Sequence, residues 1–362
     1  MNNVFLVKSP LQLLNAIEAK HYFRLEDKDC YLLVMGDRKS YLQLMKLVAI
    51  SRQWPNVTLL NKVGLLAHDP WLQNVDLGEI DKHGDALLRS SVFSIRRLNR
   101  LASSIPNVKK IFIGDNNNKF MRHFVNQTKH ETTILLDDGT ATLEIARQRM
   151  QGRSIIKPDK FLKKVKLAAK RLFQGLNDKP VDKAVFFTAY NIDVKSPDQV
   201  VVNGFSYLKK SSLTLECSDN VYFLGSPLSE VGLMTERSYM EQLGIVRSLY
   251  PVVHFVYVAH RRENKQKLDL IRQLPDVSVV LFEYPVEFQF SMIGPKPHKI
   301  ASFITSALDN LDIILDESVE IVSYKLIDGS YNNHERIDAI YEHYRTHEGG
   351  RLQVRTLSGS VC

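Results

Sequence analysis

The sequence is poor in cysteine and has no long apolar run. Its three cysteines, Cys30, Cys217 and Cys362, are odd in number and far apart, which argues against a disulfide framework and against a zinc site. No stretch reaches the ~18 consecutive apolar residues that a membrane-spanning helix needs. The first residues follow a strand pattern instead of a signal-peptide pattern. We therefore expect a cytoplasmic protein, either soluble or peripheral on the inner face of the membrane.

The sequence also lacks the motifs of several functional classes. It contains no glycine-rich dinucleotide fingerprint and no P-loop, which argues against NAD-dependent enzymes and kinases. A net charge of +8 favours anionic partners. The basic residues are not interleaved with aromatic residues, however, and no helix-turn-helix or RNA-binding signature is present. We therefore expect no nucleic acid partner and consider lipid headgroups and phosphorylated sugars.

The 362 residues alternate strand-like and helix-like segments, which predicts mostly parallel sheets with helices on both faces. Strands are predicted at 4–7, 30–35, 57–60, 110–113, 133–136, 222–224, 252–259, 277–282, 313–315 and 320–323. Helices are predicted at 11–23, 41–50, 91–104, 230–243, 265–274, 302–311 and 335–346. The length suits two domains, which we place at 1–155 and 184–335, with a linker helix at 156–183 and a closing helix and tail at 336–362.

The predicted linker contains a basic amphipathic segment at 158–173. This segment carries six Lys or Arg residues and one Asp, and its apolar residues recur at helical spacing. It is suited to an anionic membrane surface, which attracts roughly 1 kcal/mol per basic residue. It is equally suited to packing on its own domain with the lysines in water. The sequence leaves both interpretations open.

Two predicted strands end abruptly at residues suited to acid–base chemistry. The strand at 133–136 ends in Asp137 and Asp138, and the strand at 252–259 ends in His260 and Arg261. Both runs are continuously apolar, as expected of strands covered on both faces. Because ligands bind beyond the carboxyl ends of strands in open α/β sheets, this pattern predicts one cleft built from two domains.

Each of these motifs also has a purely structural interpretation. Asp137 and Asp138 stand before a glycine, which is ordinary turn chemistry, but at a cleft rim a carboxylate can accept a proton or bind magnesium. His260 and Arg261 suit a solvated basic turn. They also suit an anion site in which the imidazole donates a proton or a hydrogen bond to a phosphate and the arginine binds it through two hydrogen bonds. His254, within the strand, is interpreted as a packed core histidine.

A third candidate element is a proline-punctuated loop that leads into the predicted helix at 302–311. Ser302, Thr305 and Ser306 place hydroxyls in the first turns, where free N–H groups also make a phosphate site. Ordinary N-capping by Ser302 is the alternative. Upstream, Glu283 and Glu287 follow a predicted strand, where a carboxylate can accept the two hydroxyls of a ribose.

Five motifs together resemble the bacterial lipooligosaccharide sialyltransferases of glycosyltransferase family 52. Each motif is weak alone, but their order and spacing over about residues 1–325 make the set fairly specific. The motifs are FLVKSPLQLL at 5–14, LLDDGT at 135–140, LGSPL at 224–228, YVAHRRE at 257–263 and TSAL at 305–308.

This resemblance implies a GT-B fold, in which two Rossmann-like domains face a deep cleft and the C-terminal domain holds CMP-sialic acid. It implies that Asp137, with Asp138 second, is the general base and that His260 lies against the CMP phosphate. Thr305 and Ser306 would grip that phosphate. The same motifs and the loops between them give the remaining candidate substrate-binding residues: Ser9, Gln12, Gly139, Gly225, Ser226, Arg261, Glu283 and Glu287.

The resemblance further implies a reaction without a metal or cofactor and an acceptor that is a lipid-linked or surface glycan. Two departures concern the donor. Related enzymes often have His-Pro where this chain has His260-Arg261, and Ser-Ser where it has Thr305-Ser306. The extra arginine leaves CMP-linked legionaminic, pseudaminic or Kdo-type sugars open as donors. A UDP-linked hexose on the same fold, and a non-catalytic protein that binds nucleic acid or an anionic membrane, remain as alternatives.

Overall fold

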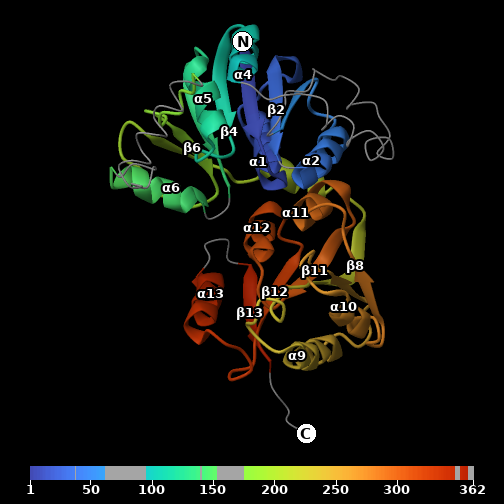
Figure 1. Cartoon of the computed structure of the whole chain (residues 1–362). Coiled ribbons are helices and arrows are strands. Elements are labelled where there is room, and N and C mark those ends of the chain that lie inside the picture. Colours follow the sequence, from blue (N-terminus) through green and yellow to red (C-terminus); the bar gives the residue numbers. More distant parts are fainter. Residues whose placement is uncertain (37, 62–94, 139–140, 153–174, 347–350, 358–362) are drawn as a thin grey trace. The chain divides into compact units, whose positions relative to one another are not determined.

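The computed structural model describes residues 1–36, 38–61, 95–138, 141–152, 175–346 and 351–357. The chain divides into two compact units, Met1–Gly204 and Phe205–Cys362, and each unit is built on its own parallel sheet (Figure 1).

The first unit contains a seven-stranded sheet in the order β3-β2-β1-β4-β5-β6-β7. Its strands are β1 (Asn2–Val7), β2 (Cys30–Gly36), β3 (Asn56–Asn61), β4 (Val108–Ile113), β5 (Thr132–Leu136), β6 (Val185–Thr188) and β7 (Gln199–Val202). Its helices are α1 (Pro10–Tyr22), the short η1 (Asp27–Asp29), α2 (Arg38–Ser51), α4 (Ile95–Ser104), α5 (Lys119–Gln127) and α6 (Ala141–Met150). The strand order reverses between β1 and β4, and ligands of such sheets bind at that switch point.

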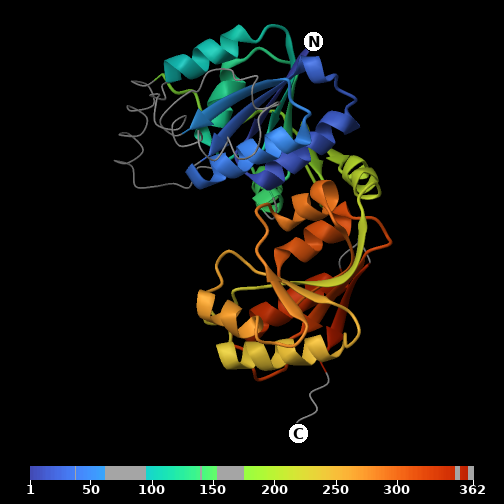
Figure 2. The same cartoon turned by 90° about the vertical axis from the view of Figure 1, so that its right-hand side faces the viewer.

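The first sheet is covered by helices on both faces, as Figure 2 shows. The face that carries Val4 and Leu6 packs against Leu98 of α4, Phe124 of α5 and Ile145 of α6 in one apolar cluster. On the other face the rings of Phe5 and Phe112 stack 4.1 Å apart, and Phe5 also meets Trp54 edge-on. Burial on both faces explains why these strands are continuously apolar.

The second unit contains a six-stranded sheet in the order β10-β9-β8-β11-β12-β13. Its strands are β8 (Cys217–Leu224), β9 (Phe255–Val258), β10 (Val277–Val280), β11 (Lys296–Ser302), β12 (Glu320–Lys325) and β13 (Leu352–Thr356). Its helices are α8 (Ser206–Ser212), α9 (Glu236–Ser248), α10 (Lys265–Ile271), α11 (Val286–Phe288), η3 (Gln289–Ile293), α12 (Ser306–Ile314) and α13 (His334–Thr346). Phe223 of β8 lies at its centre, in ring contact with Phe255, Tyr257 and Phe303.

The predicted alternation of strands and helices is confirmed in both units, with two local errors around α12. The predicted loop before this helix is strand β11, which pairs with β8 and β12. Its one proline, Pro297, is tolerated because the register with β8 shifts between Pro297 and Lys299. The predicted strand at 313–315 is wrong, because Ile314 ends α12.

The unit boundary lies later than the predicted one at 183/184. Strands β6 and β7 extend the first sheet beyond β5, so residues 184–204 belong to the first unit. The segment assigned as a closing helix and tail contains α13 but also β13, which pairs with β12.

Three further outcomes concern individual predictions. His254 is exposed, so its interpretation as a core residue is wrong. The basic segment at 158–173 and Gly139 lie outside the described residues. Among the helices that the structure describes, none is both long and apolar enough to cross a bilayer.

Candidate functional site

In the first unit, the carboxyl ends of neighbouring strands carry a group of polar side chains. Asp137 and Asp138 follow β5, and Asp115 and Asn116 follow β4. The register of the two strands pairs Ile113 with Leu135, so these polar residues leave the sheet side by side. The carboxyl edge of the first sheet is therefore the place where this unit gathers its acid–base groups.

Gln12 connects the turn after β1 to this edge. Ser9 caps α1 by accepting a hydrogen bond from the Gln12 N–H at 3.3 Å. The fully buried Gln12 side chain accepts from the Lys8 N–H at 2.8 Å through Oε1 and donates through Nε2 to Asp138 Oδ1 at 2.8 Å. A Cβ at Gly114 would lie 2.3 Å from Gln12 Oε1, so this arrangement requires glycine there. The structure thus brings Gln12 to Asp138 in a positioning role, whereas the contact of Ser9 is with the Gln12 backbone.

Asp137 is the more buried of the two carboxylates, with 4% of its surface exposed. Its Oδ2 accepts from the Ala189 N–H at 2.9 Å, while its buried Oδ1 has no hydrogen-bond partner within the described part of the chain. Burial raises the pKa of Asp137 to about 6, against hydrogen bonds from Thr188, Ala189 and Thr142 that lower it. A carboxylate with this pKa is ionised at neutral pH and is a better proton acceptor than an ordinary aspartate.

Asp138 is partly exposed and is held by Gln12. Burial raises its pKa, as does the charge of Asp115, while the Gln12 hydrogen bond and the charge of Lys8 lower it. Lys8 forms an ion pair with Asp115. Asp138 is therefore the more accessible carboxylate of the two, whereas Asp137 has the more strongly perturbed pKa.

In the second unit, His260 follows β9 and is half-buried. The Arg262 N–H donates to His260 Nδ1 at 3.1 Å, and this contact assigns the ring proton to Nε2. Burial, followed by the charges of Arg261 and Arg262, lowers the pKa of His260. The imidazole is therefore neutral at neutral pH and presents an N–H donor, beside the exposed Arg261 and Arg262.

The turn after β8 is tied to the turns on both sides of it. Ser226 is buried and its Oγ donates to the Ile304 carbonyl at 2.5 Å, beyond the end of β11. Gly225 packs against the other neighbour, because a Cβ there would lie 2.5 Å from Glu263 Oε2. Both predicted residues therefore lie at this edge, but their contacts are structural. Ser302, predicted in the first turn of the helix as a phosphate-binding hydroxyl or a cap, instead ends β11 and donates to the Leu224 carbonyl at 2.7 Å.

Thr305 and Ser306 begin α12, as the hydroxyl motif predicted. Thr305 is the N-cap residue, and its Oγ1 accepts from the Ala307 N–H at 3.3 Å. Its backbone is fixed by Tyr344, whose hydroxyl accepts from the Thr305 N–H and donates to its carbonyl. Ser306 is exposed at the first helical position. Two hydroxyls at the positive end of a nine-residue helix can receive an anion.

The two candidate ribose-binding acids are placed differently from each other. Glu287 lies in α11 and accepts from the Asn310 amide of α12 at 2.8 Å, while burial raises its pKa. Glu283 is exposed in the bend after β10. The structure therefore brings Glu287 to α12.

Sequence reasoning missed several residues of both edges. Asp115 and Asn116 follow β4 in the same way that Asp137 follows β5, so the rule that identified Asp137 would also have found them. Asn116 is 2% exposed, and neither polar atom of its side chain has a partner among the described residues. Nothing in the local sequence distinguishes Lys267, which is one of two lysines on α10.

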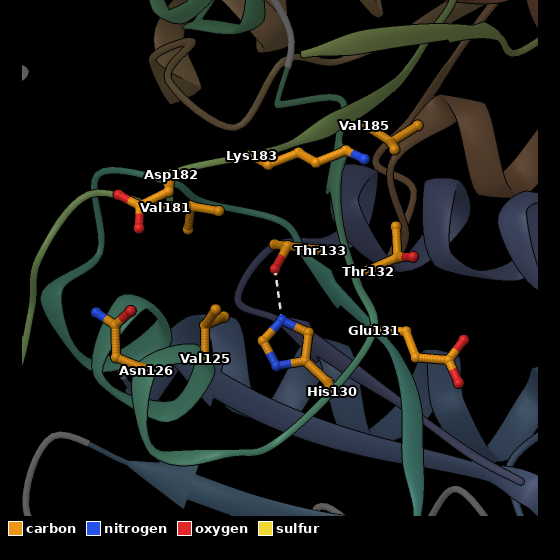
Figure 3. Close-up of a pocket in the computed structure, with 10 residues that line it drawn as sticks. All are labelled: Val125, Asn126, His130, Glu131, Thr132, Thr133, Val181, Asp182, Lys183 and Val185. Carbon is orange, nitrogen blue, oxygen red and sulfur yellow. Dashed lines mark hydrogen bonds between the residues drawn. The ribbon is translucent and has the colours of Figure 1, made fainter. Parts of the chain in front are cut away.

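A pocket of about 210 Å³ lies at the opposite edge of the first sheet, where β5 and β6 begin (Figure 3). His130 is fully engaged there, with Nδ1 2.7 Å from the Thr128 carbonyl and Nε2 2.7 Å from Thr133 Oγ1. Because ligands of parallel sheets bind at the carboxyl edge, we do not place the candidate site in this pocket. Neither in this pocket nor in the rest of the described ranges are three His, Cys, Asp or Glu side chains arranged to hold a metal ion.

The sequence matches no known family and no curated protein. The structure is similar to UDP-GlcNAc 2-epimerase from Methanocaldococcus jannaschii, with 10% identity, coverage of 99% of this chain and 89% of that chain, and a TM-score of 0.50. It is also similar to Acinetobacter baumannii MurG (8% identity, 100% and 88% coverage, TM-score 0.42). A Photobacterium 2,6-sialyltransferase in complex with CMP and lactose matches at 10% identity (98% and 78% coverage, TM-score 0.45). At 10% identity the likeness to the epimerase shows the fold alone, which is of the GT-B type with two Rossmann-like halves, as predicted.

The close approach at Gly225 gives a stability prediction. We expect Gly225→Ala to lower the free energy of unfolding by about 1–3 kcal/mol, because the new Cβ overpacks against Glu263 and Tyr257. Gly244→Ala is the matched control, since a Cβ there meets nothing within 4 Å and alanine is favoured in a helix by about 1 kcal/mol. Urea unfolding measures both variants, and equal stability of Gly225→Ala and the wild type would contradict the packing described.

The raised pKa of Asp137 gives a pH prediction. A carboxyl whose pKa is about 6 in the folded protein and ordinarily 3.8 favours folding while protonated, and this contribution is lost as the pH rises through about 6. We expect Asp137→Asn to stabilise the protein by about 1–3 kcal/mol at pH 7 and to have little effect near pH 4. Urea unfolding at several pH values tests this, and a destabilised variant at pH 7 would show that the ionised carboxylate is well compensated.

Proposed function

We propose that this protein is an inverting glycosyltransferase that moves sialic acid or a related acidic sugar from a CMP donor to a hydroxyl of a surface glycan. The observation that supports this most is the carboxyl edge of the second sheet. His260, Arg261 and the start of α12 follow strands of one sheet there, and Ser226 ties the turn after β8 to the turn before α12. Such an edge combines a neutral N–H donor, positive charge and two hydroxyls, which suits a phosphate.

On the donor side, we propose that the imidazole Nε2–H of His260 donates to the phosphate of CMP. Thr305 and Ser306 supply hydroxyl donors, and the N-terminus of α12 adds a positive partial charge. The leaving CMP carries a single phosphate, so less negative charge develops than on a departing diphosphate. Preorganised donors of this kind can stabilise that charge without a metal.

On the acceptor side, we propose that a carboxylate of the first unit takes the proton. The acceptor oxygen forms a bond to the anomeric carbon as the bond from that carbon to the phosphate oxygen breaks. The electron pair leaves with CMP, the acceptor proton passes to the carboxylate, and the anomeric centre inverts. We favour Asp137 as the base because its pKa of about 6 lies closer to neutral pH than that of an ordinary aspartate. Asp138 is the alternative because it is more exposed.

A UDP-linked hexose is the second candidate donor. The observation that favours it is the pair of exposed arginines, Arg261 and Arg262, beside His260, because two guanidinium groups suit a diphosphate as well as a monophosphate. Attachment to an anionic membrane through the segment at 158–173 remains a prediction.

We expect CMP to stabilise the protein selectively over UDP, UMP and CDP in thermal-shift and calorimetric titrations, because a ligand that binds only the folded state raises its stability. His260→Ala should weaken CMP binding about tenfold, which corresponds to the loss of one hydrogen bond to a charged group. His254→Ala is the matched control, since His254 is exposed just before the amino end of the same strand. A preference for UDP would overturn the donor assignment, and indifference to all four nucleotides would favour a non-catalytic protein.

A further inference from the structure

Glu263 is a buried carboxylate that the proposed reaction does not use. Its side chain has no exposed surface. Oε2 accepts from the backbone N–H of His260 at 2.7 Å, and Oε1 accepts from the Tyr257 hydroxyl at 2.6 Å. Lys267 Nζ is the third polar group around the Glu263 carboxylate, 2.8 Å from Oε1. The turn that carries His260 is thus anchored from beneath by a single side chain.

Lys267 extends this anchor to the turn after β8. Its side chain is also fully buried, and Nζ donates to the Ser226 carbonyl at 3.1 Å and lies 3.5 Å from Glu230 Oε2. Nζ also lies 3.5 Å from the ring centroid of Tyr239, whose hydroxyl is 2.7 Å from that of Tyr257. One ion pair therefore ties two turns of the candidate anion site together.

The charges of this pair suit a site for an anion. A carboxylate alone beneath the turn would repel a phosphate and would favour a protonated imidazole. Lys267 balances the charge of Glu263. The two side chains together therefore hold the backbone N–H of His260 without adding net charge beneath the turn. A buried pair of this kind contributes little to stability compared with apolar residues of the same volume, so folding alone does not account for it.

We propose that Glu263 and Lys267 are positioning residues for His260: they fix its turn so that Nδ1 receives the Arg262 N–H and Nε2–H is presented to the anion. The step from a fixed imidazole to a bound phosphate rests on the proposed function. The fixed imidazole itself does not, because it follows from the contacts of the second unit.

Other charged groups also face the imidazole and are considered in the test. Arg261 and Arg262 lie on its own turn, Glu230 follows β8, and Lys267 lies on α10. Because these groups surround His260, a change in its pKa alone cannot identify the positioning effect. The tautomer of His260 and its coupling to ligand binding are the readouts that do.

The decisive variant is Glu263→Gln/Lys267→Met, which removes both charges and keeps the side-chain volumes. Its matched control is Arg237→Met/Glu241→Gln, which neutralises an exposed pair with the same i,i+4 spacing on α9. The tautomer of His260 is measured by imidazole ¹⁵N NMR, with the resonance assigned from a His260→Gln spectrum. CMP affinity is measured by calorimetry.

We expect the wild type and the control to show His260 as the Nε2–H tautomer. In the Glu263→Gln/Lys267→Met variant we expect a mixture of both tautomers. CMP binding should weaken by less than the about tenfold loss of His260→Ala, because only the fraction of the protein in the Nε2–H tautomer donates to the phosphate. In a His260→Gln background the same pair of substitutions should cost no further affinity, because a positioning residue acts only through the residue it positions.

An unchanged tautomer in the paired variant would overturn the proposal, and so would a loss of CMP affinity that adds fully to that of His260→Gln. If the wild type binds no CMP, the donor assignment fails, while the NMR result still decides whether the pair positions His260. Should the paired variant not fold, Tyr257→Phe removes one of the groups that hold Glu263. It should give the same tautomer mixture to a smaller extent, and an unchanged tautomer there would equally overturn the proposal.

Discussion

The structure depends on how the turns at the carboxyl ends of its parallel strands satisfy their buried polar groups. Strands covered on both faces leave the sheet in an apolar environment, and an unpaired buried polar group there costs about 1–3 kcal/mol. In the first unit Gln12 meets this constraint by joining the turn after β1 to Asp138. In the second unit Ser226 and the buried pair of Glu263 and Lys267 join the turns that follow the three neighbouring strands β9, β8 and β11.

The same burial sets the chemistry of the candidate groups. Burial raises the pKa of Asp137 toward neutral pH and lowers the pKa of His260 further below it, because burial favours the uncharged form of each group. A carboxylate that accepts protons more readily and an imidazole that stays neutral are the two properties that the proposed transfer requires. Gln12 and Glu263 are not themselves reactive in this account. They hold the reactive groups in defined orientations.

The sequence predicted the features that depend on local pattern. Buried strands that end in polar residues located both edges, and the fold class followed from their alternation with helices. Strands β7 and β13 lie at sheet edges and are only partly apolar, so they escaped notice. Pro295, just before β11, and Pro297, within it, made that strand resemble a loop. The contacts that fix the site join distant residues, as with Gln12 and Asp138, which are 126 positions apart. No local pattern reveals such a pair.

The central claim is that CMP-linked acidic sugar is the donor, and its most direct test is turnover followed by ³¹P NMR. The protein is incubated with CMP-sialic acid, UDP-glucose and UDP-GlcNAc together, with deacylated bacterial lipooligosaccharide as the acceptor. The account predicts that CMP appears at the expense of CMP-sialic acid while both UDP-sugars persist. Consumption of a UDP-sugar with CMP-sialic acid left at its uncatalysed rate of decay would contradict it.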